Sequence, residues 1–204
     1  MKDEKRDVRH EKLKTIRDRV VNLKDSTLYS FRNENEYLPV IGQGDHYAEI
    51  MFIGEAPGES EAKSGVPFCG RAGKVLDELL QSINIPREEV YITNIVKDRP
   101  PQNRDPSPEE IALYAPFLDE QIEIIEPKVI ATLGRFSMEY ILKRYGLEDK
   151  IEPISKIHGQ LVKANFKYGD VFITPLYHPA VALYNAGQKE TLIEDFKNIK
   201  KALS

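Results

Sequence analysis

Residues 54–73 read GEAPGESEAKSGVPFCGRAG, and this stretch decides the fold. An apolar run at 50–53 precedes it, and apolar residues at helical spacing follow it from Val75 to Ile83. Its five glycines and two prolines predict a rigid, close-fitting loop at the carboxyl end of a strand. Ligands of open α/β sheets bind at such strand ends, and purely structural connections are usually only a few residues long. The stretch therefore predicts a binding site on an α/β fold.

Two later segments have the same form of a strand followed by a loop. The sequence YITN occupies 91–94, and YHPA occupies 177–180. In an open α/β sheet, ligands bind beyond the carboxyl ends of neighbouring strands. We therefore expect one pocket that is built from three strand ends.

The chain alternates strands with helices. Apolar and β-branched runs predict strands at 48–55, 89–96, 128–134, 160–168 and 171–176. Helical spacing predicts helices at 8–24, 74–84, 107–126 with a kink at Pro116, 136–145 and 192–203. Such alternation predicts a parallel sheet with helices on both faces.

The N-terminal region is expected to contribute one amphipathic helix and little else. Leu13, Ile16 and Val20 recur at helical spacing between charged residues, and the first seven residues are expected to be frayed. Residues 25–47 are expected to form an irregular connection. At 204 residues the chain is predicted to be one domain, 1–204, with 1–24 as its N-terminal helix.

Composition indicates a soluble protein of a reducing compartment. No run approaches the length of a membrane span, and the charged segment 1–14 is unlike a signal peptide. The single cysteine, Cys69, excludes an internal disulfide and an all-cysteine metal site. We therefore expect a cytoplasmic location and no membrane association.

The overall charge does not indicate a nucleic-acid-binding protein. The formal net charge is −4 and the pI about 5.7, whereas such domains are often basic. Lys97, Arg99 and Arg104 nevertheless fall near the second strand end, where they can form a local basic rim. Solvated surface charge is the alternative interpretation for each of them.

Glu55 and His178 are the candidate catalytic residues. Glu55 directly follows an apolar strand, where desolvation would raise its pKa and suit it to activate water; a capping role is the alternative. His178 is the one histidine that ends a strand inside a proline-stiffened loop. Its N–H could stabilise a developing oxyanion, or it is an ordinary half-buried histidine. Nothing around it has the spacing of zinc ligands.

Asn94 and Phe68 are candidate binding residues. The Asn94 carboxamide can donate to one ligand atom and accept from the next, which suits a nucleobase edge; tying loops together is the alternative. Phe68 lies between Pro67 and glycines, so its ring is either part of the core or a stacking platform. Cys69 has no neighbouring base in the sequence and is interpreted as an ordinary small residue.

Taken in order, GEAPG with PFCGRAG, then YITN, then YHPA, resemble the uracil-DNA glycosylase superfamily, and most of all its bacterial and archaeal family 4. The likeness runs from about Leu23 to Leu203 and includes VKDRPPQNRDPSPEEI and PKVIATLG. It implies a three-layer α/β/α sandwich around a short, mainly parallel sheet. It also implies an enzyme that flips a nucleotide out of DNA and removes uracil.

The resemblance implies a role for each pocket residue. Phe68 would stack on the uracil ring, and Asn94 would select uracil over cytosine. His178 would bind O2 of the base, and Glu55 would orient the water that attacks C1′. The same carry-over makes Glu61 a pocket wall near C5 that helps to exclude thymine, and it makes Ala56 a further substrate-binding position.

DNA contacts are also implied by the resemblance. Arg99 and Arg104 would dock the DNA. The apolar run Val181, Ala182 and Leu183 would fill the gap that the flipped base leaves, without identifying which of the three inserts.

One departure from family 4 is clear in the sequence. Members of that family normally hold a [4Fe–4S] cluster with four cysteines, whereas the matching positions here hold Leu23, Ser26, Asp98 and Tyr114. Because Cys69 lies elsewhere, four thiolates are not available. We expect no cluster, no metal site and no other cofactor, with Leu23 and Tyr114 packing where the cluster would be.

The sequence thus predicts a monomeric uracil-DNA glycosylase acting on uracil-containing DNA. A catalytically weak DNA-damage-binding protein is one alternative, against which the joint presence of Glu55, Phe68, Asn94 and His178 argues. A glycosylase for deaminated purines is another, and Asn94 favours uracil over it.

Overall fold

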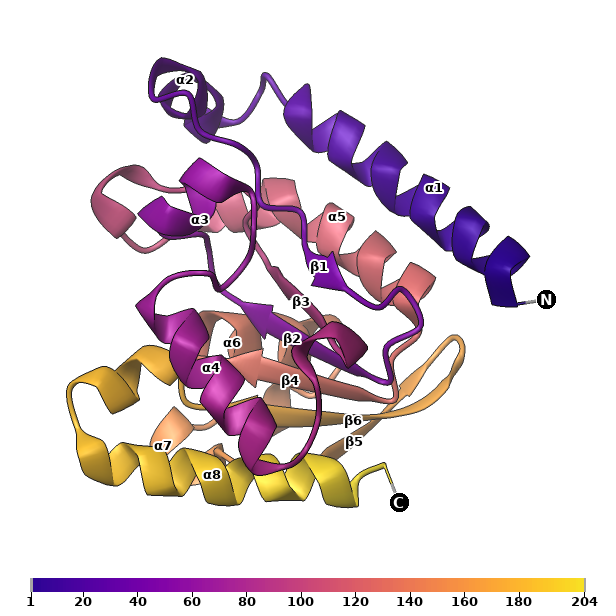
Figure 1. The fold of residues 1–204 in the computed structure, drawn as a ribbon, viewed down its shortest axis with the longest axis vertical. Helices are drawn as coiled ribbons and strands as arrows, with labels where there is room; N and C mark the ends of the chain where they lie inside the picture. Colours follow the sequence, from indigo (N-terminus) through magenta and orange to yellow (C-terminus); the bar gives the residue numbers. More distant parts are fainter. Residues whose placement is uncertain (1, 204) are drawn as a thin grey trace.

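The computed structural model describes residues 2–203, without the side chains of residues 2–7 and 186. Within this range a six-stranded sheet has the order β1-β3-β2-β4-β6-β5 (Figure 1). Its strands are β1 (Gln43–Gly44), β2 (Ile50–Gly54), β3 (Tyr91–Asn94), β4 (Val129–Leu133), β5 (Val162–Phe166) and β6 (Gly169–Leu176).

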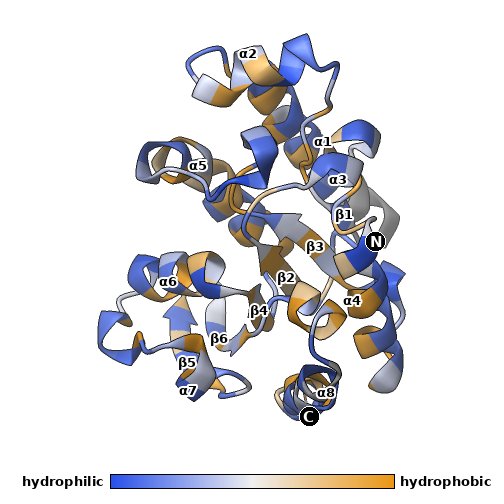
Figure 2. Cartoon of the chain, turned by 90° about the vertical axis from the view of Figure 1, so that its left-hand side faces the viewer, coloured by the Kyte–Doolittle hydropathy of each residue, from blue (hydrophilic) through white to orange (hydrophobic). Residues whose placement is uncertain are grey.

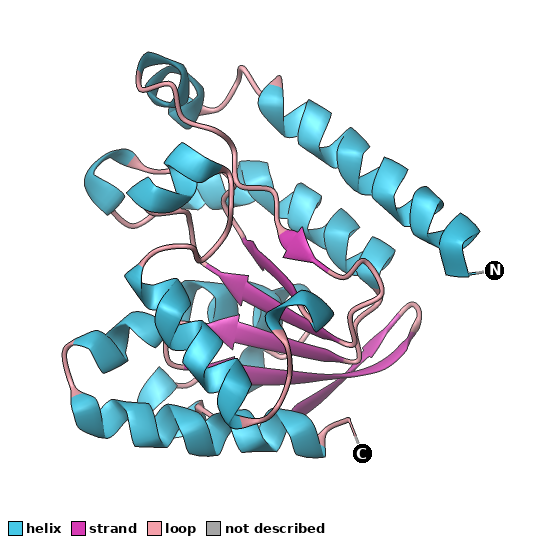
Figure 3. Ribbon diagram, viewed as in Figure 1, coloured by secondary structure: helices cyan, strands magenta, loops and turns pink. Residues whose placement is uncertain are grey.

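The four central strands are parallel. β2 pairs with β3 and β4, and β4 pairs with β6, whereas the edge strands β1 and β5 are antiparallel to their neighbours. In this register Gly54 lies opposite Asn94, and Leu133 lies opposite Leu176. Figure 3 shows the arrows of β2, β3 and β4 pointing to one edge of the sheet. The carboxyl ends of the predicted strands therefore meet at that edge.

The helices account for much of the rest of the chain. The α-helices are α1 (Lys2–Val21), α2 (Thr27–Glu34), α3 (Glu59–Ser64), α4 (Arg71–Ser82), α5 (Pro108–Ile125), α6 (Arg135–Arg144), α7 (Ile154–Ile157) and α8 (Ala186–Lys201). Short 3₁₀ turns are η1 (Arg87–Glu89), η2 (Pro101–Asn103), η3 (Glu148–Lys150) and η4 (Pro179–Leu183).

Two hydrophobic cores lie on opposite faces of the sheet. The α5-side core joins α1, α5 and α6 to the face of β2 that carries Met51 and Ile53. The α4-side core joins α4 and α8 to the opposite face, which carries Ile50 and Phe52. Figure 2 shows the sheet between these two helix layers, with hydrophobic residues concentrated in the strands. The predicted three-layer α/β/α sandwich is confirmed.

The strand sequences explain this arrangement. All five residues of β2 and all five of β4 are buried, as expected for parallel strands that are covered on both faces. A strand with one wet face would instead alternate apolar and polar residues. Continuous apolar runs therefore specify a central position in the sheet.

Two predicted elements were wrong in detail. The segment 25–47, predicted to be irregular, contains α2, which Ser26 caps by accepting from the backbone N–H of Leu28. The stretch 54–73 contains the helix α3, which the sequence pattern did not reveal. The helix predicted at 107–126 is α5, which runs without interruption from Pro108 through Ile125 and contains Pro116. No helix within 2–203 has the length and apolar character to cross a membrane.

Candidate active site

A cavity of about 330 Å³ opens at the carboxyl edge of the parallel strands. Its walls come from the 54–73 stretch, the end of β3, the segment after β3, and the turn that follows β6. The lining residues are Glu55, Ala56, Pro57, Gly58, Glu61, Phe68, Ala72, Asn94, Pro100, Asn103, Arg104, His178 and Ala180. The structure thus brings seven of the predicted site residues together, and it leaves Arg99 and the run 181–183 outside this lining.

Asn94 is the last residue of β3 and lies opposite Gly54 of β2. Its side chain is buried, with 2% of the residue exposed, and its carboxamide makes no hydrogen bond to any residue in the described range 2–203. Buried polar groups nearly always have partners. The free carboxamide facing the cavity is therefore available to a ligand.

Gly54 makes room for this arrangement. A Cβ at Gly54 would lie 2.3 Å from Asn94 Oδ1 and 2.8 Å from the Phe68 ring. Both distances are shorter than real side chains allow. The glycine at the end of β2 is therefore required for the asparagine and the aromatic ring to share the pocket floor.

Phe68 is held in a fixed position. Its φ of 48° is in the left-handed region, which non-glycine residues adopt only when the surroundings enforce it. A Cβ at Gly73 would lie 1.7 Å from the Phe68 carbonyl oxygen, so the start of α4 packs directly on this backbone. The ring is 7% exposed, joins the α4-side core and also lines the cavity. Both sequence interpretations of Phe68, core residue and pocket platform, therefore describe its position.

His178 is a neutral donor at physiological pH. Burial lowers the pKa of its imidazole to about 4, a change that the charge of Glu61 partly opposes. Its Nδ1 accepts from the backbone N–H of Ala180 at 3.2 Å. The ring proton is therefore on Nε2. The ring centroid lies 5.6 Å from that of Phe68, with the two planes 31° apart.

Two carboxylates complete the wall. Burial, together with the charge of Asp105, raises the pKa of Glu55 to about 7, although Arg135 acts in the opposite direction. Glu61 comes from α3, and its Oε1 accepts from the backbone N–H of Gly70 at 2.9 Å. Glu55 therefore changes between acid and base near neutral pH, which is the range suited to general acid–base work.

One residue of the predicted basic rim, Lys97, does not lie at the surface. Lys97 is fully buried and donates to Thr93 Oγ1 at 2.8 Å, to the Asn94 carbonyl at 2.6 Å and to Gln121 Oε1 at 2.5 Å. Burial holds its pKa well below the usual value. Its position in the sequence suggested a surface residue, whereas it supports the backbone of Asn94 from inside.

The two arginines of this segment are already paired. The Arg99 side chain is 10% exposed and donates to Tyr37 Oη at 2.7 Å and to Asn103 Oδ1 at 2.8 Å. The Arg104 side chain is 45% exposed, lines the cavity and forms an ion pair with Glu110. Arg104 can reach a ligand at the cavity mouth, whereas Arg99 mainly holds its own loop.

In the turn after His178, the most exposed residue is not one of the three that were predicted to contact DNA. Val181, Ala182 and Leu183 are half-buried and pack on the α4-side core. Tyr184, directly after them, is 83% exposed. The sequence analysis did not predict Tyr184, nor did it predict Pro100 and Asn103 as residues of the cavity. For Tyr184 the sequence did offer a signal, namely an aromatic residue directly after the last apolar position of the run.

The residues present do not fit an iron–sulfur cluster. Tyr114 Oη lies 2.5 Å from Asp98 Oδ2 and 2.9 Å from Ser26 Oγ, so these oxygens already have partners. Tyr114 is also buried in the α5-side core, and Leu23 lies half-buried against that core. Cys69 is exposed and outside this group. No cluster of three potential metal ligands occurs in the described part of the chain.

Comparison with known proteins agrees with the geometry. The sequence profile of the uracil DNA glycosylase superfamily matches residues 41–203. A Type-4 uracil-DNA glycosylase of Sulfurisphaera tokodaii is 45% identical over 190 residues, covering 93% of this chain and 84% of that protein. One from Saccharolobus solfataricus is 46% identical over 193 residues, covering 94% and 87%. One from Thermotoga maritima is 41% identical over 163 residues, covering 79% and 81%. The predicted resemblance is confirmed, and the chain belongs to the uracil DNA glycosylase superfamily.

Proposed function

We propose that this DNA glycosylase removes uracil from DNA by hydrolysing the N-glycosidic bond of a flipped-out deoxyuridine, which leaves an abasic site. One observation carries the proposal. The unbonded Asn94 carboxamide, the Phe68 ring and the Nε2–H of His178 line one small cavity, where they offer an amide pair, a stacking surface and a donor.

Base selection would rest on Asn94. Its Oδ1 can accept from N3–H of uracil while its Nδ2 donates to O4. Cytosine carries a donor and an acceptor in the opposite order at these positions, so both contacts would be lost. A site that is built to hydrogen-bond a substrate rejects an analogue that leaves its buried polar groups unpaired. Glu61 would lie near C5 and help to exclude the thymine methyl group.

Bond cleavage would use His178 and Glu55. As the N1–C1′ bond breaks, its electron pair passes to the base, and the Nε2–H of His178 would donate to O2, where negative charge grows. A neutral imidazole suits this role because it donates without needing a prior proton. Glu55, as the carboxylate, would orient water and accept a proton as the water oxygen bonds to C1′.

Docking of the DNA would use the rim of the cavity. Arg104 at the mouth and the turn at 181–184 are the proposed contacts, with Arg99 holding the loop behind Arg104. The proposed partner is uracil-containing DNA, and the proposed active form is a monomer in the cytoplasm. The absence of a cofactor stays a prediction as well.

The test is excision from a single-stranded oligonucleotide with one uracil, followed by alkaline cleavage of abasic sites. Matched oligonucleotides carry thymine, cytosine or hypoxanthine at the same position. Purified Glu55→Gln protein is assayed in parallel, because its loss of activity assigns the excision to this protein and not to a contaminant. Cleavage at uracil alone is expected. Preferential cleavage at hypoxanthine would favour the deaminated-purine alternative, and no cleavage by folded protein would favour the DNA-binding alternative.

A further inference from the structure

Asp98 lies at the centre of a buried polar network. The Arg32 and Asp98 side chains are 5% and 0% exposed, and Arg32 Nη1 donates to both carboxylate oxygens at 3.1 and 2.9 Å. The Tyr114 hydroxyl donates to Asp98 Oδ2 at 2.5 Å and lies 2.9 Å from Ser26 Oγ. A buried pair with excellent geometry and further hydrogen bonds is the case in which such a pair is tolerated.

The network joins four elements, which come from two separate parts of the sequence. Arg32 from α2 also donates to the carbonyls of Val20 and Val21 at the end of α1, at 3.1 and 2.5 Å. Ser26 caps the start of α2, Asp98 follows β3, and Tyr114 belongs to α5. One buried point thus fixes α1, α2, the exit of β3 and α5 relative to one another.

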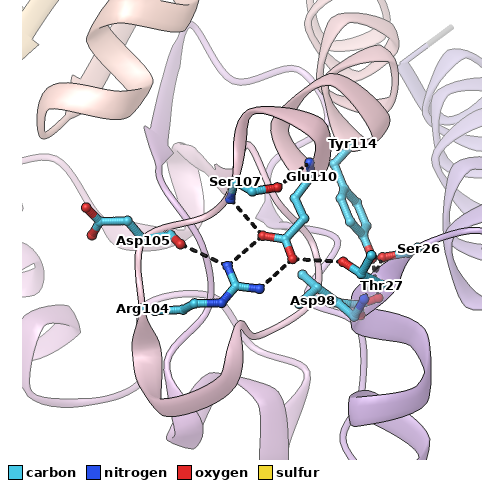
Figure 4. Close-up of polar contacts among 9 residues, drawn as sticks. Ser26, Thr27, Asp98, Arg104, Asp105, Ser107, Glu110 and Tyr114 are labelled. Carbon is cyan, nitrogen blue, oxygen red and sulfur yellow. Dashed lines mark hydrogen bonds and ion pairs between the residues drawn. The ribbon is translucent and has the colours of Figure 1, made fainter.

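A second buried carboxylate holds the other end of the same segment. Glu110 is 3% exposed and accepts from Arg104 at 2.7 and 2.8 Å, from the Ser107 N–H at 2.8 Å and from Thr27 Oγ1 at 2.9 Å. Figure 4 shows Glu110 between Arg104 and Thr27, with Ser26, Asp98 and Tyr114 close to Thr27. The segment 98–110 is therefore anchored at both ends, and each anchor includes a residue from 26–27.

The anchored segment forms part of the proposed uracil pocket. Pro100, Asn103 and Arg104 lie between the two anchors and line the cavity. Asn103 also has a left-handed φ of 54°, a conformation that asparagine adopts more readily than most residues. Loss of an anchor would therefore move the cavity wall without changing any residue that contacts the base.

The first anchor is built from positions that the resemblance to family 4 matches to the cluster cysteines. Three of the four positions matched to cluster cysteines, Ser26, Asp98 and Tyr114, are joined here by hydrogen bonds. The fourth, Leu23, is one turn away, with its carbonyl 3.2 Å from the Ser26 N–H. The positions thus converge as cluster ligands must, but their oxygens bind one another and Arg32.

We propose that the network of Arg32, Asp98, Tyr114 and Ser26 replaces the cluster as the cross-link that holds the segment 98–110 against the pocket. Asp98 and Arg32 are positioning residues for excision. This inference rests on the proposed function as far as excision is concerned. The immobilisation of the segment can be measured without DNA.

The experiment compares Asp98→Asn with the matched variant Asp119→Asn. Asp119 likewise accepts from a tyrosine and an arginine, Tyr140 at 2.7 Å and Arg144 at 2.6 Å, but it connects α5 to α6 and does not line the cavity. Deuterium uptake by the backbone amides of 99–109 is measured at neutral pH, with folding checked by circular dichroism. Tyr114→Phe is a milder variant in case Asp98→Asn does not fold.

The rate of deuterium uptake in 99–109 is expected to rise roughly a hundredfold in Asp98→Asn. Removing the Asp98 carboxylate leaves the buried Arg32 charge uncompensated, which loosens the segment. The rate should rise less in Tyr114→Phe and stay near wild type in Asp119→Asn. With uracil-containing DNA, Asp98→Asn should raise the half-saturating concentration roughly tenfold and change the maximal single-turnover rate less. Uptake that rises equally over the whole chain, or not at all in 99–109, overturns the proposal.

A rescue variant tests the claim of replacement. Leu23→Cys, Ser26→Cys, Asp98→Cys and Tyr114→Cys are combined, and the protein is treated anaerobically with ferrous iron and sulfide. We expect it to bind iron and to regain slow uptake in 99–109 relative to the same protein without iron. Failure to bind iron would show that these positions do not form the equivalent site. Because uptake requires no DNA, a failed excision assay with wild-type protein would overturn the proposed function alone.

Discussion

His178 and Glu55 illustrate how burial alone sets the chemistry of a side chain. Both lie at the edge of the same cavity, and desolvation disfavours the charged form of each. The effect keeps the histidine neutral and keeps part of the glutamate protonated near neutral pH. Burial therefore makes His178 a neutral donor and makes Glu55 a group that titrates near neutral pH in the same cavity.

His178→Ala is expected to slow uracil excision roughly 100- to 1000-fold, since one oxyanion donor is worth roughly 2.7–4 kcal/mol in comparable sites. The melting temperature should change little by comparison. His158→Ala is the matched control, because His158 is half-buried, faces Asp195 at 2.8 Å and lies outside the cavity lining. Single-turnover rates measure both variants. Equal rates for the two would show that His178 has no role in the chemistry.

The pH dependence of excision should follow Glu55. Because its pKa is raised to about 7 and the carboxylate is the proposed active form, kcat/KM should increase with pH up to about 7 and then level off. His178, with a pKa of about 4, adds no change in that range. In Glu55→Gln the rise of kcat/KM with pH should disappear.

The stability of Glu55→Gln should also depend on pH in a different way from that of wild type. As pH rises from 4.5 to about 7, the variant should gain free energy of unfolding relative to wild type, because the wild-type protein then ionises a partly buried carboxyl group.

At the scale of elements, the site depends on how closely strand ends and loops approach one another. β2 ends in a glycine, β3 ends in the asparagine, and the loop before α4 lays an aromatic ring over both. The turn η4 places His178 at its start and Tyr184 just beyond its end. Small changes in these approaches should therefore affect function more than stability.

Gly54→Ala is expected to disable the pocket. The added Cβ would collide with Asn94 Oδ1 and with the Phe68 ring, and overpacking of this kind typically costs about 1–3 kcal/mol of stability. Excision should fall much further than that loss implies, because both displaced groups are proposed to contact the base. Gly187→Ala is the control, since its Cβ would meet only Asn185 Oδ1 at 3.4 Å within α8. Melting curves and excision rates are compared, and normal excision by Gly54→Ala would contradict the assigned geometry.

Tyr184→Ala and Leu183→Ala should separate DNA contact from core packing. Tyr184 is 83% exposed, so its removal should change stability by no more than about 0.5 kcal/mol. If its ring stacks in the gap that the flipped base leaves, Tyr184→Ala should slow excision from duplex substrate about 5- to 100-fold, since stacking is worth roughly 1–3 kcal/mol per base. Excision from single-stranded substrate should slow less. Leu183→Ala should mainly lower the melting temperature. The opposite pattern would support insertion by Leu183.

At the scale of the whole molecule, the N-terminal helix is part of the α5-side core although it precedes the residues 41–203 that match the superfamily profile. It contributes Leu13, Ile16 and Val20 to that core, and its last carbonyls accept from Arg32. The net charge is −4, and Arg99 and Arg104 each already have an acceptor partner within the protein. Docking should therefore depend on shape at the cavity as well as on charge.

Ile16→Ala is expected to destabilise the protein by about 2–5 kcal/mol, because Ile16 is 1% exposed and its removal leaves a cavity. Val8→Ala, in the same helix but 56% exposed, should have an effect within about 0.5 kcal/mol. Urea unfolding followed by circular dichroism gives both values. A single transition that shifts in Ile16→Ala would support the prediction of one domain, whereas an unshifted main transition would mean that α1 folds independently.

The sequence by itself determined the layers of the fold and the composition of the pocket. Apolar runs and loop-forming residues are local signals, and parallel strands necessarily bring their carboxyl ends to one edge. That is sufficient to place Glu55, Phe68, Asn94 and His178 around one cavity. The short helices α2 and α3 were not predicted, because eight and six residues show little helical periodicity.

Only the tertiary structure decided which charged residues are buried and which residues they pair with. A lysine or arginine in a sequence is expected at the surface, yet Lys97 and Arg32 are buried. Each has a partner from another segment: Arg32 and Asp98 are 66 residues apart, and Lys97 and Gln121 are 24 apart. The burial of a charge depends on whether the fold brings such partners within hydrogen-bond distance, and no local pattern carries that information.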